Sequence, residues 1–332
     1  MSVNTAFLTG GSGFVGGAVL TRLLAEGVRV RALARSETAA RILADRGAEP
    51  VLGSLADDEA LRDGMQGCDV VFHVAGVNAG CVRDPAPLYT ANVSGPERVI
   101  RAAAAAGVPR VVHTSSAAAV AEREGEIARE DTEPSGSFPT HYARSKFLGE
   151  RKAFEAGRQT GVEVVTVNPS SVQGPGRTGG TAKLLLRVAR SRTAILVRTW
   201  FSVVDVEDCA EGHLLAATAG RGGERYLLSG ASLSTETAVE LLRRATGRPA
   251  RTVWVPRGAV RAAAPLAGMV ERFGRGDPIL CPGMIRTLLH GHRADGSRAT
   301  RELGLTYRPA EVTLRRALAW YEGRGMLGPP PA

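Results

Sequence analysis

A glycine-rich turn near the N-terminus constrains the fold of this chain more than any other feature. A short apolar run at 6–8 leads directly into glycines at positions 10, 13 and 16, and apolar residues at helical spacing follow from 14 to 24. Glycine allows a tight turn, a close backbone approach to a phosphate, and close packing of a helix on a strand. The start of the helix adds amide donors and the positive end of its dipole. The sequence therefore predicts a strand–turn–helix unit that binds a pyrophosphate.

Strand and helix patterns alternate through the first half of the chain. The predicted strands lie at 6–8, 28–33, 51–52, 70–75, 111–115 and 162–167, and the longest predicted helices lie at 87–106 and 142–159. Such alternation predicts a parallel sheet with helices on both faces. We therefore expect an α/β fold, a Rossmann-type doubly wound parallel sheet. Residues 1–170 would form the dinucleotide-binding domain. Residues 171–332 would form a smaller, mostly helical substrate lobe, interleaved with late strands that return to the main sheet.

The distribution of charge argues against nucleic acid as a partner. The 332 residues carry a formal net charge of +9, with 42 basic and 33 acidic residues. The basic residues are scattered, and aromatic residues make up only 5% of the chain, too few for an obvious platform on which bases stack. All but three of the basic residues are arginine. The positive charge is therefore interpreted as an arginine bias, and no nucleic-acid binding is expected.

The cysteines and the N-terminus bear on the compartment. The four cysteines, at 68, 81, 209 and 281, are far apart and form no Cys-x-x-Cys pair. This spacing predicts neither a disulfide framework nor a zinc knuckle, and it fits a reducing compartment. The first residues lack the charged start and the apolar core of a signal peptide, and no run of about 18 apolar residues occurs. We therefore expect a soluble cytoplasmic protein with no membrane partner and no metal site.

The end of the second predicted strand bears on the choice of cofactor. In dinucleotide-binding sheets, an acidic residue at this point binds the 2′-hydroxyl of the adenosine ribose. Here the position is occupied by Ala34, and Arg35 follows it. An arginine can pair with a 2′-phosphate. The sequence therefore favours NADP(H), with NAD(H) as the alternative.

Tyr142 and Lys146 are candidates for acid–base chemistry. Their separation of four residues places them on one face of a predicted helix. A nearby ammonium stabilises phenolate and lowers the pKa of a tyrosine from about 10, which would make Tyr142 a usable proton donor or acceptor near neutral pH. The strand at 111–115 leads into Ser115 and Ser116, at the end of a parallel strand that faces the ligand crevice. One of these serines could bind a substrate carbonyl oxygen, and the residues alone do not choose between them.

Several segments occur in an order that characterises one enzyme superfamily. They are 9–16, 69–75, 92–95, 114–116, Tyr142 with Lys146, and Asn168-Pro169. Together they resemble the extended short-chain dehydrogenases/reductases, the NAD-dependent epimerase/dehydratase superfamily. Segments 204–213 and 224–228 extend the resemblance over nearly the whole chain. The chain is most similar to dihydroflavonol-reductase-like proteins and to the hopanoid-associated sugar epimerase group.

The resemblance implies an NAD(P) cofactor and a catalytic triad. By position, Ser116 matches the catalytic hydroxyl, Tyr142 the acid–base group, and Lys146 the helper that also binds the nicotinamide ribose. Residues 53–55 read Gly-Ser-Leu instead of the family's Gly-Asp-Leu, so Ser54 would replace the usual acidic contact to adenine. The expected cofactor-binding residues are Gly10, Gly11, Ser12, Gly13, Phe14, Val15, Gly16, Arg35, Ser54, Leu55, Ala75, Gly76, Thr114, Tyr142, Lys146, Pro169, Ser171 and Val172.

Positions in loops suggest which residues contact the substrate. The resemblance to the family suggests the oligomeric state. The candidates are Cys81, Arg83, His141, Asn168, Gln173, Arg177 and Trp200. Members of the family often form dimers through the helices that correspond to 87–106 and 142–159. We therefore expect a small-molecule substrate and a homodimer.

Three functions are compatible with these motifs. The first is reduction of a ketone or aldehyde carbonyl by hydride transfer, with Ser116 and Tyr142 at the oxygen. The second is an NAD(P)-dependent epimerase or dehydratase of a (nucleotide-)sugar that uses the same triad. Ala117-Ala118 stand where sugar dehydratases carry an Asp-Glu pair, which argues against dehydration but not against epimerisation. The third is a non-catalytic NADP-sensing protein, which the presence of both Tyr142 and Lys146 disfavours.

Overall fold

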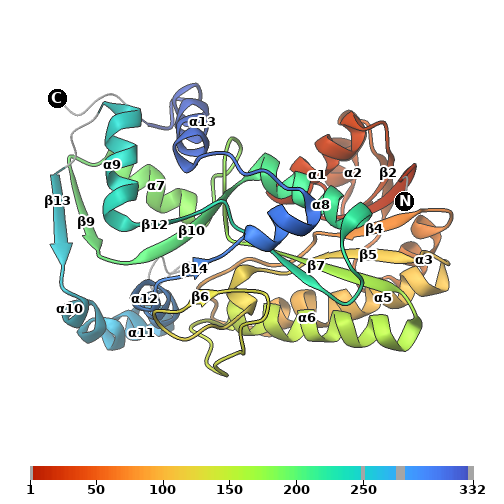
Figure 1. Ribbon diagram of the computed structural model, residues 1–332, viewed down its shortest axis with the longest axis horizontal. Helices are drawn as coiled ribbons and strands as arrows, with labels where there is room; N and C mark the ends of the chain where they lie inside the picture. The colour runs from red at the N-terminus through yellow and green to blue at the C-terminus, as the bar shows by residue number, and fades with distance from the viewer. Residues whose placement is uncertain (1–2, 248–250, 274–280, 328–332) are drawn as a thin grey trace.

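A seven-stranded parallel sheet forms the centre of the larger lobe in the computed structural model, which describes residues 3–247, 251–273 and 281–327 (Figure 1). The strand order is β11-β7-β5-β4-β1-β2-β3. These strands are β1 (Thr5–Thr9), β2 (Arg29–Ala34), β3 (Glu49–Leu52), β4 (Val70–His73), β5 (Arg110–Thr114), β7 (Glu163–Pro169) and β11 (Arg225–Leu228). The order reverses between β1 and β4, and ligands of doubly wound sheets bind at such a switch point. The Rossmann-type fold predicted from the sequence is confirmed.

Helices cover both faces of this sheet, as the continuous apolar strands predict. One face packs against α1 (Phe14–Ala25), α2 (Glu37–Asp45) and α8 (Val206–Ala219), and the other against α3 (Asp58–Met65), α5 (Gly95–Ala105) and α6 (His141–Thr160). Successive residues of β1 serve opposite cores, because side chains alternate across a strand. Ala6 and Leu8 enter the first core, and Phe7 enters the second.

The segment before α5 differs from the single long helix expected at 87–106. A short helix, α4 (Ala86–Tyr89), runs into a π-helical turn at Thr90–Ser94, which continues into α5. This turn contacts α6 closely. A Cβ atom at Gly149 of α6 would lie 1.8 Å from the carbonyl oxygen of Asn92. The extra residue of the π-turn thus occurs where the backbones of two elements approach each other.

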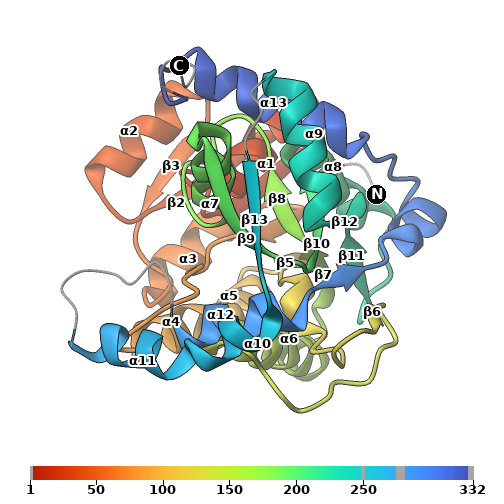
Figure 2. The same cartoon turned by 90° about the vertical axis from the view of Figure 1, so that its left-hand side faces the viewer.

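The C-terminal lobe contains more strands than its sequence pattern indicates. A three-stranded sheet has the order β12-β10-β8, a second sheet pairs β13 with β9, and a third pairs β14 with β6. These strands are β6 (Ile127–Ala128), β8 (Ser171–Gln173), β9 (Thr193–Val197), β10 (Trp200–Asp205), β12 (Ala231–Ser234), β13 (Arg251–Val255) and β14 (Arg293–Ala294). The helices of the lobe are α7 (Thr181–Arg190), α9 (Thr235–Thr246), α10 (Arg257–Ala262), α11 (Ala264–Phe273), α12 (Pro282–His290) and α13 (Ala310–Glu322). In Figure 2 the β9–β13 pair faces the viewer. Strand β11 pairs with β7 at the edge of the main sheet.

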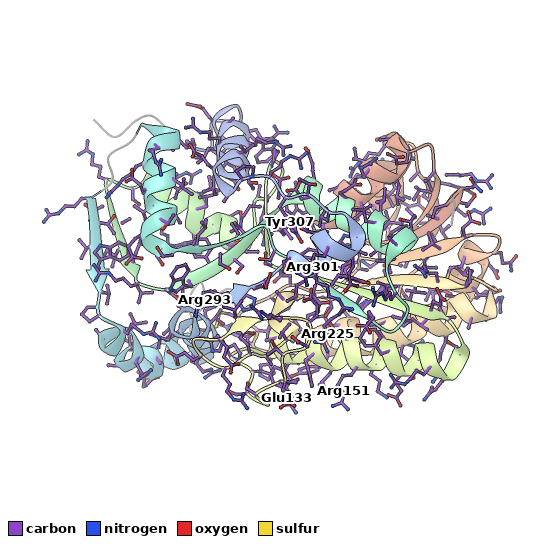
Figure 3. The ribbon with its side chains drawn as sticks, viewed as in Figure 1. Glu133, Arg151, Arg225, Arg293, Arg301 and Tyr307 are labelled. Atoms are coloured by element: carbon purple, nitrogen blue, oxygen red, sulfur yellow. A yellow bond between two sulfur atoms is a disulfide. The ribbon has the colours of Figure 1, made fainter. Side chains whose placement is uncertain are left out.

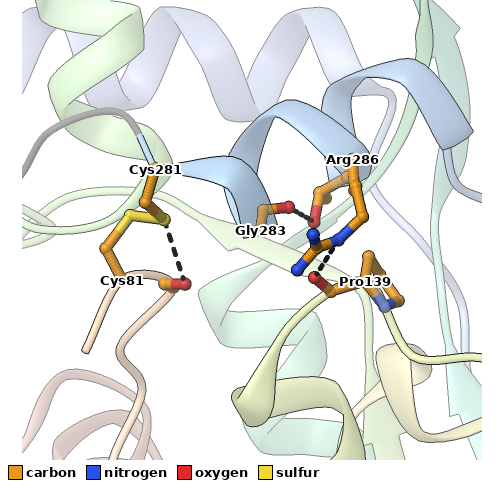
Figure 4. The surroundings of a disulfide bond; sticks show 7 residues. Cys81, Pro139, Cys281, Gly283 and Arg286 are labelled. Atoms are coloured by element: carbon orange, nitrogen blue, oxygen red, sulfur yellow. Dashed lines mark hydrogen bonds between the residues drawn. A yellow bond between two sulfur atoms is a disulfide. The ribbon is translucent and has the colours of Figure 1, made fainter. Parts of the chain in front are cut away.

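A disulfide corrects the expectation drawn from the cysteine spacing. Cys81, in the loop after β4, is bonded to Cys281, the residue that precedes α12 (Figure 4). The two residues are 200 positions apart in the chain, but their Cα atoms lie 5.9 Å apart. Cys68 and Cys209 are free and buried. Sequence spacing gave no signal, because tertiary folding alone brings the two segments together.

None of the helices in the described residues is both long enough and apolar enough to cross a bilayer.

We predict that Gly149→Ala destabilises the protein by about 2–3 kcal/mol, because the new methyl group would overlap the backbone at Asn92. Gly258→Ala is the matched control. It also adds one methyl group to a helix, but no heavy atom lies within 4 Å of the new Cβ, and alanine favours a helix over glycine by about 1 kcal/mol. Urea unfolding measures both changes. Equal stability of the two variants would contradict the close approach of α6 to the π-turn.

Candidate active site

The glycine-rich turn between β1 and α1 has room for glycine only. Gly10 has a φ of +79°, and a Cβ atom there would lie 2.7 Å from the amide nitrogen of Ala75. A Cβ atom at Gly16 would lie 2.1 Å from the carbonyl oxygen of Gly10. Gly13 precedes α1 as its N-cap residue. The turn therefore leaves the first amides of α1 open to a phosphate, and these residues fit a dinucleotide.

One large cavity connects this turn to the C-terminal lobe. Its volume is about 3310 Å³, more than the roughly 300–1,000 Å³ of a pocket for one small ligand. A cavity of this size can hold a dinucleotide and a second molecule. The predicted residues that line it are Gly10, Ser12, Gly13, Phe14, Val15, Gly16, Arg35, Leu55, Ala75, Gly76, Cys81, Arg83, Thr114, Ser116, Tyr142, Lys146, Pro169, Ser171, Val172, Gln173, Arg177 and Trp200. Four predicted residues do not line it: Gly11, Ser54, His141 and Asn168.

Two of those four have local structural roles. The Ser54 hydroxyl accepts a hydrogen bond from the amide of Ala56 at 3.2 Å and so shapes the turn that leads to α3. His141 is exposed at the start of α6, and its Nδ1 lies 3.2 Å from the Tyr89 hydroxyl. Leu55 and the exposed Arg35, in contrast, line the cavity.

The side chains of Tyr142 and Ser116 lie next to each other in the cavity. Thr140 caps α6 by accepting a hydrogen bond from the amide of Ala143 at 3.1 Å, which starts the helix just before Tyr142. The Ser116 side chain lies close enough to the Tyr142 phenol to lower its pKa. The Ser115 hydroxyl, in contrast, is buried with no hydrogen-bond partner in the described residues. The structure therefore brings Ser116, and not Ser115, to the phenol.

Lys146 lies one helical turn after Tyr142 and is buried. Its Nζ donates a hydrogen bond to the carbonyl oxygen of Thr114 at 2.8 Å, at the end of β5. Burial lowers the pKa of Lys146 to about 8, and the carboxylate of Glu150 opposes this shift. The ammonium is therefore close to its titration point at mildly alkaline pH.

The electrostatics of Tyr142 differ from the expectation. Burial raises the pKa of the phenol, while the Ser116 side chain and the positive charge of Arg177 lower it. We expected Lys146 to be the cation that acts on Tyr142, but Arg177 has this role in the structure. The guanidinium of Arg177 also lies over the ring of Phe14, 5.6 Å from its centroid, between the glycine-rich turn and the phenol.

A network of buried polar side chains lies next to Ser116. Its central residue, Glu150, was not among the residues predicted from the sequence. The Asn168 amide donates to the carbonyl oxygen of Ser116 at 3.1 Å and to Glu150 at 2.6 Å. Arg225 of β11, labelled in Figure 3, lies 3.3 Å from the other carboxylate oxygen of Glu150. Asn168 is fully buried and therefore positions the Ser116 turn, whereas we had expected it to contact the substrate. The sequence contained one indication of Glu150, because it follows Lys146 by four residues and therefore lies on the same face of the helix.

The other predicted substrate residues have varied environments. Cys81 is held in the disulfide. The Gln173 amide nitrogen donates to the hydroxyls of Ser171 and Thr181, at 2.9 and 2.7 Å. Trp200 is 46% exposed on the cavity wall, and Arg83 is exposed in the loop after β4.

A second cluster that the sequence did not indicate joins the lobes at the end of α12. The buried carboxylate of Glu122 accepts hydrogen bonds from His290 Nε2 at 3.3 Å and from His292 Nδ1 at 2.5 Å. Burial alone would raise the pKa of Glu122, but these two donors lower it to about 2. The preceding residue, Ala121, has a φ of +56°, which is uncommon outside glycine. Three residues line the same cavity: Glu122, His290 and His292. None of the His, Cys, Asp and Glu clusters in the described residues has the make-up of a metal site.

The comparison with protein families decides the class. The model of the NAD dependent epimerase/dehydratase family matches residues 6–229. The chain belongs to this family. It is an NAD(P)-dependent enzyme of the extended short-chain dehydrogenase/reductase type.

Individual relatives agree with this family. Sterol demethylase protein B of Methylococcus capsulatus is 33% identical over 329 residues, which cover 97% of this chain and 100% of that protein. The 4-hydroxy-2-methyl-3-oxo-4-farnesyl-3,4-dihydroquinoline-1-oxide ketoreductase of Stigmatella aurantiaca is 37% identical over 270 residues, 80% of each chain. Among solved structures, gox2253 is 29% identical with a TM-score of 0.85, and the match covers 98% of this chain and 99% of that one.

We predict that the Lys146 ammonium titrates with a midpoint near pH 8. Glu150→Gln should lower this midpoint, because the carboxylate favours the charged form of the lysine. Carbon NMR of the lysine Cε groups measures it, and Lys152→Arg and Lys183→Arg assign the signals, since the chain has only three lysines. An unchanged midpoint in Glu150→Gln would contradict the coupling.

Proposed function

We propose that the protein is an NADP(H)-dependent reductase of a ketone or aldehyde carbonyl in a small molecule. The observation that carries the proposal is that Tyr142 and Ser116, whose side chain lowers the pKa of the phenol, both line the cavity that also contains the glycine-rich turn. The ketoreductase name of the Stigmatella aurantiaca relative supports reduction as the net reaction. Ala117 and Ala118 follow Ser116 in place of an acidic pair, which speaks against sugar dehydration.

The chain's own residues supply the acid–base part of the reaction. When bound, NADPH supplies a hydride to the carbonyl carbon. The Ser116 hydroxyl donates a hydrogen bond to the carbonyl oxygen and orients it beside Tyr142. Tyr142 transfers its proton to this oxygen as the alcohol forms, which leaves a phenolate. The positive charge of Arg177 stabilises that phenolate, since it lowers the pKa of the phenol.

The preference for NADP(H) rests on Arg35. It follows the last residue of β2, lines the cavity and is exposed. Ala34 supplies no carboxylate that could bind a ribose hydroxyl. A guanidinium at this position can donate paired hydrogen bonds to a 2′-phosphate, which is a geometry that arginine favours.

Tyr142→Phe should reduce kcat by about 10²–10⁴-fold, the usual contribution of a general acid. Affinity for NADPH should stay within about threefold of the parent's, and the midpoint of thermal unfolding, measured without ligand, should be unchanged. Steady-state kinetics with any ketone that the protein reduces, together with a cofactor titration, measure these quantities. Turnover equal to the parent's would refute the assigned role.

Arg35→Ala should weaken NADPH binding by about 10–100-fold, which corresponds to the loss of a charge-assisted hydrogen bond, and should leave NADH binding nearly unchanged. Arg41→Ala is the matched control, because Arg41 is also exposed nearby on α2 but does not line the cavity. Fluorescence titration with both cofactors gives the ratio. A parallel loss of NADH and NADPH affinity would count against recognition of the 2′-phosphate.

A further inference from the structure

The cavity wall beyond Tyr142 exposes large apolar side chains. Four such residues line the cavity and are at least a third exposed: Val77 at 36%, Leu184 at 48%, Ile195 at 71% and Trp200 at 46%. They come from the loop after β4, from α7, from β9 and from the start of β10. Exposed apolar side chains scattered singly need no explanation, but several around one cavity mark a binding site.

Partly buried apolar residues continue this wall between the exposed ones. Val260 contributes from α10, and Met284 and Leu288 contribute from α12. Helix α12 is held in place at its start by the Cys81–Cys281 disulfide and by the hydrogen bond from Arg286 to the carbonyl oxygen of Pro139 (Figure 4). The apolar wall is therefore part of a fixed structure rather than a loose segment.

Some polar groups at this end of the cavity are engaged within the protein, whereas Gln173 Oε1, Thr199 Oγ1 and His292 Nε2 are buried with no hydrogen-bond partner in the described residues. The carboxylate of Glu122 binds two imidazoles, and the amide nitrogen of Gln173 binds two hydroxyls. Lys183 and Arg187 are exposed and flank Leu184 on α7. Long basic side chains can pack their carbon chains on apolar surface and keep the charge in water, so their presence is compatible with an apolar ligand.

We propose that this wall binds the hydrocarbon body of an elongated apolar substrate whose carbonyl group reaches Ser116 and Tyr142. The assignment rests on the proposed reductase function and names its substrate class, an alkyl or polycyclic ketone rather than a nucleotide sugar. Burial of about one CH₂ group in such a site improves affinity about fourfold. The length of the hydrocarbon body would increase the affinity of the substrate. Ser116 and Tyr142 would orient its carbonyl group.

The experiment compares methyl ketones of increasing length, from 2-pentanone to 2-undecanone, with the protein saturated with NADP⁺. Equilibrium dialysis gives the Kd of each ketone, and the rate of NADPH oxidation with the same ketones is measured separately. We expect Kd to fall about threefold to fourfold per added methylene. Leu184→Asp should flatten this dependence for the longest ketones. Ile42→Asp, at a residue 44% exposed on α2 and outside the cavity, should retain it.

The outcomes separate this assignment from the reductase proposal. Chain-length-dependent binding without turnover would support the apolar site and count against the reductase function. Turnover of short and long ketones with equal Kd would support the reductase and overturn the apolar site. Equal flattening in Leu184→Asp and Ile42→Asp, or binding of UDP-glucose more tightly than 2-undecanone, would also overturn it.

Discussion

The buried carboxylate of Glu150 holds together the three elements on which the site depends. It lies one turn after Lys146 on α6, accepts a hydrogen bond from Asn168 on β7, and pairs with Arg225 on β11. Asn168 in turn binds the carbonyl oxygen of Ser116. A charge in the interior is tolerated only with such partners. The same contacts that neutralise it therefore fix the catalytic helix, the serine turn and the last sheet strand relative to one another.

The C-terminal lobe is attached to this centre at several points, and each one also shapes the cavity. Strand β11 extends the main sheet beside β7, and the disulfide and the Glu122 cluster hold the two ends of α12. As a result, segments that are far apart in the sequence form the apolar wall of the cavity. The chain crosses from one lobe to the other between these segments. A site of this kind can keep its acid–base groups constant while the covering lobe determines which molecule reaches them.

The sequence predicted the parts of the molecule that local patterns encode. The glycines at 10, 13 and 16, the strand–helix alternation, and the Tyr142–Lys146 spacing depend on neighbouring residues. They led to the fold and to a set of site residues, most of which line the cavity. It did not predict the Cys81–Cys281 bond or the Glu122 cluster, because each joins residues more than 160 positions apart. Asn168 was assigned to the substrate for a related reason. Its motif placed it at the crevice, but only the tertiary structure shows that its amide is occupied within the core.

The central claim is that the protein delivers a hydride to a carbonyl carbon while Tyr142 protonates the oxygen. The most direct measurement follows deuterium from NADPH labelled at C4 of the nicotinamide during turnover of a long-chain ketone. The account predicts one deuterium on the carbinol carbon of the alcohol for each cofactor oxidised, on one face only, and a proton from solvent on the oxygen. Deuterium that returns to the cofactor without net oxidation, as in a cycle of oxidation and re-reduction on a sugar, would contradict it.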